Sequence, residues 1–182
     1  MKGVVFTEFL EMVEETFSDE MADRIIDASD LPSQGAYTSL GTYDHHELIQ
    51  LVTHLSQTTG ISKSELITKF GEHLFQRFVK SFPQFFENTS HAFDFLKHLE
   101  SYIHMEVRKL YSDAELPQFT YESPNPDTLI MNYSSSRPLG DLAEGLIIGC
   151  IKHFDNKIDI VRENLPDKSR TQVCFILTEM TL

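Results

Sequence analysis

The apolar residues in the first two thirds of the chain recur at steps of three and four positions, which is typical of amphipathic helices. Ser62 and Glu65 form a capping-box pattern that opens one such helix, and Pro83 closes it. Another helix is expected from about residue 90 to about residue 110. The apolar stripes consist of Phe6, Phe9, Leu10, Val13 and Phe17, then Leu48, Leu51, Val52 and Leu55, then Leu66, Phe70, Leu74, Phe78 and Val79, and finally Phe93, Leu96, Ile103, Val107 and Leu110. The N-terminal part is therefore predicted to be helical.

The character of the sequence changes after Pro117, where short β-like runs replace the helical period. The turn cluster Ser-Pro-Asn-Pro-Asp at 123–127 predicts a hairpin, and a later connection is expected around 165–169. The predicted elements are strands at 118–123 and 128–134, a buried helix at 141–154, and strands at 157–164 and 170–179. The fold class is α+β, with a helical part followed by a small antiparallel sheet that one helix crosses.

The composition indicates a single globular domain. The chain has 182 residues, of which 41% are hydrophobic, and this is enough for one full core. Acidic residues outnumber basic ones by 28 to 15, so the formal net charge is −13 and neither nucleic acid nor an anionic membrane is an expected partner. The start lacks the apolar run of a secretory signal, and two cysteines fit a reducing compartment, so we expect a cytoplasmic protein.

The familiar motifs of catalysis and phosphate binding are missing from the sequence, so an enzyme is not expected. His46 begins a zincin-like pattern, but position 50 is Gln where the second histidine would have to be. Cys150, His153 and Cys174 could bind zinc if the helix over 141–154 met the last strand. Ordinary packed cysteines are the alternative interpretation, and we favour it.

The stretch NYSSSRPLGDL, residues 132–142, places Tyr133, Ser135 and Arg137 at alternate positions. In an extended segment these side chains point the same way, and their donors suit a carboxylate or a phosphate. Upstream, His104 borders the apolar stripe of the expected 90–110 helix, where a half-buried flank histidine is the simplest interpretation. A single histidine can nevertheless ligate haem iron, because the porphyrin supplies the other four nitrogens. Haem also carries two propionates that the three donors could neutralise.

Three stretches resemble the H-NOX family, the haem nitric oxide/oxygen-binding domains related to the haem domain of soluble guanylate cyclase. They are MKGVVF at the start, HMEVRKLYSDAELPQF beginning at His104, and YSSSRPLGDLAEGLIIG at 133–149. The resemblance spans nearly the whole chain and implies haem b between a helical distal subdomain, 1–62, and a proximal α/β subdomain, 63–182. The site residues that it implies are His104 as axial ligand, Pro117 against the porphyrin, and Tyr133, Ser135 and Arg137 on the propionates.

The resemblance also indicates which gases bind. Relatives that hold oxygen place a distal tyrosine on the helix after the Y-x-S-x-R pattern, and this position falls on Leu142. The positions of assisting groups fall on Phe9 and Leu74. None of these side chains donates a hydrogen bond, so we expect NO and CO to bind ferrous haem and oxygen to be excluded.

A switching mechanism is implied by the same resemblance. NO weakens the bond opposite to it, so His104 is released and strain held by Pro117 relaxes, which gives the two states that a switch needs. The chain is expected to act on a separate protein, either a histidine kinase or a cyclic-di-GMP enzyme. Two alternatives stay open: a haem-free acidic interaction module, and a haem enzyme, although a peroxide-processing site needs a distal acid or base that is not seen here.

Overall fold

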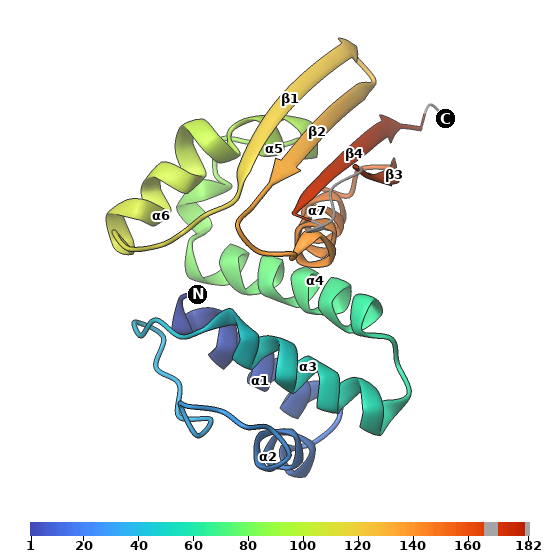
Figure 1. Cartoon of the computed structure of the whole chain (residues 1–182). Coiled ribbons are helices and arrows are strands. Elements are labelled where there is room, and N and C mark those ends of the chain that lie inside the picture. The colour runs from blue at the N-terminus through green and yellow to red at the C-terminus, as the bar shows by residue number, and fades with distance from the viewer. Residues whose placement is uncertain (166–170, 181–182) are drawn as a thin grey trace.

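The computed structural model describes residues 1–165 and 171–180 (Figure 1). The α-helices are α1 (Gly3–Thr16), α2 (Asp19–Asp27), α3 (His45–Thr59), α4 (Lys63–Ser81), α5 (Ala92–Lys97), α6 (His104–Leu110) and α7 (Gly140–His153). Two short helical turns are also present, a 3-10 turn η1 (Pro83–Phe85) and a π turn η2 (Leu99–Ile103). In these two described ranges, no helix combines the length and apolar character needed to cross a bilayer.

In the part of the chain that the structure describes, the sheet has four antiparallel strands in the order β1-β2-β4-β3. These are β1 (Gln118–Asn125), β2 (Thr128–Ser134), β3 (Ile158–Asn164) and β4 (Gln172–Glu179). Alternate residues of the two central strands, such as Met131 on β2 and Phe175 on β4, are fully buried against α7 and α5. The α+β prediction is confirmed, including the hairpin and the crossing helix. The predicted connection at 165–169 lies, apart from its first residue, outside the described residues.

Side-chain caps explain where the N-terminal helices begin. The Ser62 hydroxyl accepts the backbone N–H of Glu65 at 3.2 Å, as the capping-box pattern predicted. The Ser18 hydroxyl caps α2 in the same way by accepting the N–H of Met21 at 3.2 Å. Helix α2 was absent from the sequence-based interpretation, although its apolar residues Met21, Ala22, Ile25 and Ile26 do recur at helical steps after Ser18.

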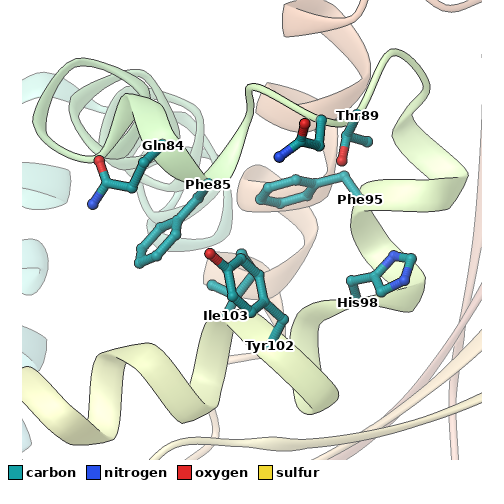
Figure 2. Close-up of a pocket in the computed structure, with 8 residues that line it drawn as sticks. Gln84, Phe85, Thr89, Phe95, His98, Tyr102 and Ile103 are labelled. Carbon is teal, nitrogen blue, oxygen red and sulfur yellow. The ribbon is translucent and has the colours of Figure 1, made fainter.

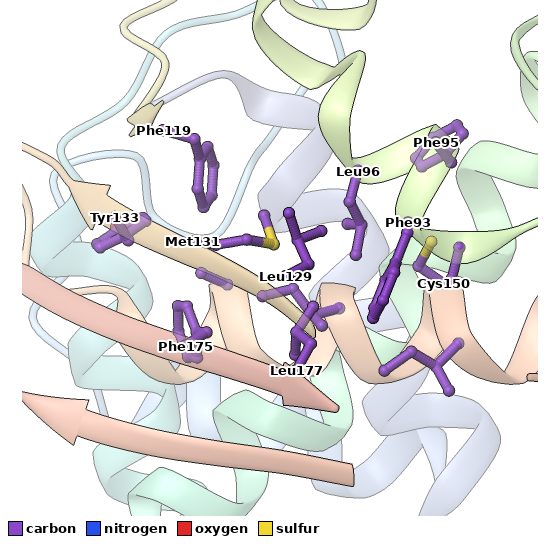
Figure 3. Close-up of a cluster of buried hydrophobic side chains, with 14 of the residues drawn as sticks. Phe93, Phe95, Leu96, Phe119, Leu129, Met131, Tyr133, Cys150, Phe175 and Leu177 are labelled. Carbon is purple, nitrogen blue, oxygen red and sulfur yellow. The ribbon is translucent and has the colours of Figure 1, made fainter. Parts of the chain in front are cut away.

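Two apolar cores meet at α4. The N-terminal core contains the buried side chains of α1, α2 and α3 together with Leu66 and Phe70 of α4. The sheet core lies between α5, α7 and the sheet (Figure 3). It also includes Phe75 of α4. Helix α4 lies between the two groups of elements in Figure 1. The predicted subdomain boundary between residues 62 and 63 falls at the start of α4, which contributes side chains to both cores.

Glycines allow α4 and α7 to approach each other closely. A Cβ atom on Gly145 would lie 2.0 Å from the carbonyl oxygen of Thr68, and one on Gly71 would lie 2.5 Å from the carbonyl oxygen of Leu142. Both obstacles are backbone atoms, so a side chain at either position could be accommodated only if the helices moved apart. Leu74 lies on α4 about one turn beyond Gly71, and Leu142 lies on α7 about one turn before Gly145.

The prediction of a single helix over 90–110 is wrong, because the π turn η2 separates α5 from α6. The backbone N–H of Ile103 bonds to the carbonyl oxygen of His98 at 3.2 Å, which is the i to i+5 spacing of a π turn. Such a turn inserts one residue into the helix and rotates the α6 segment about the helix axis. His104 is consequently turned inward, with 8% of its surface exposed, while its neighbour Met105 is 47% exposed.

Candidate haem site

A cavity of about 440 Å³ opens between α1, α4 and α7 on one side and η2, α6 and the 111–117 segment on the other. This volume lies within the range of about 300–1,000 Å³ that is common for ligand pockets. Seven of the eight predicted haem-site residues line it: Leu74, His104, Pro117, Tyr133, Ser135, Arg137 and Leu142. Residues that are far apart in sequence therefore converge on one chamber.

The helical walls of this cavity are apolar. Every residue that α1, α4 and α7 contribute to the lining has a hydrocarbon side chain: Val4, Val5, Leu74, Phe75, Phe78, Leu142, Ala143, Leu146 and Ile147. Polar side chains gather elsewhere on the lining, on His104, on the 111–117 segment and around Arg137. The cavity thus suits a large apolar ligand that carries polar groups at one edge.

Phe9 is the predicted distal residue that the structure places outside the cavity. Its side chain is fully buried in the N-terminal core, where its ring contacts the edge of Phe70 at a centroid distance of 5.3 Å. Val5, one helical turn earlier on α1, lines the cavity in its place, as do Phe78 and Leu146. The spacing of four residues between Val5 and Phe9 was visible in the sequence, but it could not tell which turn of α1 reaches the cavity.

His104 has one ring nitrogen occupied and one available. Its Nδ1 donates to Oε1 of Glu100 at 2.9 Å, since a carboxylate can only accept. Nε2 therefore carries the free lone pair that a metal ligand needs. Burial lowers the pKa of the His104 imidazole below its ordinary value of 6.5, and the Glu100 carboxylate opposes that shift. A buried neutral imidazole is the form that binds a metal.

This lowered pKa predicts a pH dependence for the haem-free protein. Because folded His104 holds a proton less readily than the unfolded chain, the free energy of unfolding should fall as the pH drops below about 6.5 towards the lowered pKa. His104→Gln should flatten this dependence. Urea unfolding of both proteins from about pH 8 to about pH 5 measures the difference, and parallel curves would contradict the assignment.

Tyr133, Ser135 and Arg137 lie together, as predicted, although not through strand alternation alone. Strand β2 ends at Ser134, and the chain then turns so that the Arg137 N–H bonds to the Ser135 hydroxyl at 3.1 Å. Burial raises the pKa of the Tyr133 phenol, while a hydrogen bond with Ser135 and the charge of Arg137 act in the opposite direction. The phenol therefore stays protonated and can donate.

Arg137 already binds a carboxylate in this structure. Its guanidinium donates to the backbone oxygen of Glu115 at 3.2 Å and also pairs with the Glu115 side chain. Fork-shaped donors of this kind suit carboxylates, so the geometry fits a haem propionate. A bound propionate would have to share Arg137 with Glu115 or replace it.

A second set of contacts ties the 111–117 segment to the N-terminus. The Lys2 ammonium, with only 13% of its side chain exposed, bonds to Asp113 at 3.1 and 3.2 Å and to the Thr42 hydroxyl at 2.9 Å. Thr42 also donates to Asp113 at 2.8 Å. All three residues line the cavity, so these bonds close one of its edges.

The structure does not bring the proposed zinc ligands together. Cys150 lies in the sheet core (Figure 3), to which Val173 and Phe175 of β4 also belong. Cys174 lies between those two residues and therefore points to the opposite face. Within 1–165 and 171–180, ligand atoms are gathered only at Asp44, His45 and His46, where Asp44 caps α3.

A second, smaller pocket has a volume of about 190 Å³ (Figure 2). Phe85, Phe95 and Ile103 line both this pocket and the main cavity, so these side chains form a common wall. Nδ1 of His98, at the rim, lies 2.6 Å from the carbonyl oxygen of Asp94. The His98 ring is therefore hydrogen-bonded to the backbone of its own helix.

The chain is similar to known haem-binding proteins. The model of the family described as Haem-NO-binding matches residues 2–162. An unliganded Fe(II) H-NOX protein from K. algicida is 39% identical, with a TM-score of 0.93, and the match covers 100% of this chain and 98% of that one. An H-NOX from Shewanella woodyi, bound to IWP-051 in the Fe(II)CO state, is 38% identical, with a TM-score of 0.84 and coverage of 99% and 95%.

A third structure supports the fold alone. An H-NOX protein from S. oneidensis in the Fe(II)NO state is 24% identical, with a TM-score of 0.90 and full coverage of both chains. Among curated proteins, no match was found.

Proposed function

Because this chain belongs to the Haem-NO-binding (H-NOX) family, whose members are haem-based gas sensors, we propose that it is a nitric oxide sensor that excludes oxygen. The observation that carries the proposal is His104, an inward-turned imidazole with its Nδ1 engaged and its Nε2 free, on the lining of an apolar cavity. The proposed setting is the cytoplasm, and the proposed role is signalling without catalysis.

The residues that would hold haem b are those that converge on the cavity. His104 would supply the axial nitrogen, and Pro117 lies on the lining where it could press on a planar ring. Tyr133, Ser135 and Arg137 would donate to the propionates. When bound, haem supplies the ferrous iron at which a diatomic gas binds.

The apolar helical walls support selectivity for NO and CO over oxygen. Bound oxygen becomes polar, and it is stabilised where a side chain donates a hydrogen bond to it. Leu74 and Leu142 cannot donate. A buried polar group without a partner costs about 1–3 kcal/mol, which corresponds to roughly ten- to a hundredfold weaker oxygen binding. CO and NO need little help of this kind and should bind.

Leu142→Tyr tests this selectivity directly. The new phenol would add a donor to a wall that otherwise has none, so the reduced variant should form a stable oxygen complex in air while the natural protein does not. Ultraviolet–visible spectra of both reduced proteins in air measure the difference. Leu142→Phe, which adds a ring of similar size without a hydroxyl, is the matched control. Stable oxygen binding by the natural protein would refute the proposed selectivity.

The proposed signal is detachment of His104. His104 begins α6, and the 111–117 segment joins α6 to the sheet. Release of His104 would therefore remove one attachment of this segment, whose other attachments are the ion pairs of Asp113 and Glu115. The recipient would be a separate protein, and a histidine kinase or a cyclic-di-GMP enzyme is the proposed partner. With a net charge of −13, a basic docking surface on that partner would be complementary.

The spectrum of the purified, reduced protein tests the function as a whole. We expect a Soret band that shifts on addition of NO and of CO and is unchanged by air. A colourless protein that does not take up added haem would point instead to an acidic interaction module. Turnover with peroxide would point to a haem enzyme.

A further inference from the structure

We propose that Glu100 is a positioning residue for the axial ligand: its carboxylate holds His104 in one tautomer and orientation and strengthens the bond from Nε2 to haem iron. This inference rests on the proposed haem-binding function. It extends that function, because it names the group that sets how readily His104 is released.

The geometry places Glu100 between three elements. Its Oε1 accepts from Nδ1 of His104 at 2.9 Å and from the backbone N–H of Phe119 at 3.1 Å. Glu100 belongs to η2, His104 begins α6, and Phe119 is on β1. One carboxylate oxygen therefore fixes the imidazole to the edge of the sheet, and Tyr133 lies opposite Phe119 on the neighbouring strand.

The charge of Glu100 matters as well as its position. An imidazole that donates its second N–H to a carboxylate is oriented, and its other nitrogen becomes a more basic ligand. Hydrogen bonds to an ionised acceptor are about twice as strong as neutral ones. The side chains of His104 and Glu100 are 11% and 29% exposed, so water screens this pair only partly. Glu100 should therefore oppose the detachment of His104 and set the threshold of the switch.

The local backbone makes this contact specific. Glu100 and His104 are four residues apart on one face of the helix, where side chains meet. Glu106, the next acidic residue along, is instead paired with Lys109 at 2.5 Å. Glu106 therefore serves as a matched control, because it carries the same charge in the same region without contacting His104.

Two substitutions separate charge from position. Glu100→Gln keeps an oxygen that can accept from both donors but removes the charge, whereas Glu100→Ala removes the contact altogether. In the unliganded ferrous protein, we expect the iron–histidine stretching frequency, measured by resonance Raman, to be highest in the natural protein, lower in Glu100→Gln and lowest in Glu100→Ala. The rate of His104 detachment after NO is added should rise roughly tenfold or more for Glu100→Ala. Glu106→Gln should change neither quantity.

An unchanged frequency in both Glu100 variants would overturn the inference. A second measurement covers the case in which Glu100→Ala fails to fold. In the His104→Gly variant, free imidazole should bind the iron more tightly when Glu100 is present than when Glu100→Gln is added. Equal imidazole affinities would also overturn the inference. Failure of the proposed haem-binding function would give a different result. The natural protein would then lack an iron–histidine band, or would show one that His104→Ala leaves in place.

Discussion

His104→Ala should abolish the axial bond and most of the haem binding. Among the described residues, the substitution removes the imidazole nitrogen that the cavity lining offers to iron, and the lining contributed by α1, α4 and α7 is hydrocarbon. We expect the purified variant to contain little haem, and any haem retained should lose the iron–histidine band. Haem content per chain, from the Soret absorbance, and resonance Raman spectra measure the effect.

The matched control is His98→Ala. His98 lies nearby on the rim of the smaller pocket, with its Nδ1 beside the Asp94 carbonyl, and it does not line the main cavity. This variant should keep its haem and its spectrum. His104→Gly supplemented with free imidazole should recover the axial bond, because the small ligand can occupy the space of the lost ring. If His104→Ala kept the pigment and axial spectrum of its parent, the site assignment would be wrong.

Gly145→Ala should substantially lower the free energy of unfolding. The new Cβ would lie 2.0 Å from the Thr68 carbonyl oxygen and 2.8 Å from Cα of Gly71, and neither backbone atom can turn away. Overpacking of this kind costs about 1–3 kcal/mol and sometimes more. Urea unfolding of the haem-free protein measures the change in the free energy of unfolding.

The crossing of α4 and α7 also shapes the cavity, so this variant should alter gas binding. Leu142 and Leu146 flank Gly145 and both line the cavity, as does Leu74 across the crossing. Separation of the helices would widen this wall, and CO binding measures the consequence. Gln76→Ala, at an exposed position of α4, is the control and should stay within about 0.5 kcal/mol of the natural protein. Equal stability of Gly145→Ala would mean that the helices are not tightly packed there.

The sequence by itself was sufficient to predict most helices and strands and to select the hydrogen-bond donors of the candidate site. Apolar periods at three and four residues identified α1, α3 and α4, because a helix buries one stripe of its surface. Ser62 marked the start of α4 through local hydrogen bonding, which needs no distant partner. His104 and Arg137 were selected by their chemistry and by the family resemblance, and both line the cavity.

The tertiary structure alone decided how the elements rotate and cross. The π turn before His104 turns that ring inward, and no period in the sequence announces a single inserted residue. The crossing of α1 over its neighbours makes Val5 a cavity residue and Phe9 a core residue. Cys150 and Cys174 are separated by the sheet itself, whose two faces a linear sequence does not assign. Local patterns specify an element and its buried side, but packing against distant segments determines what that side meets.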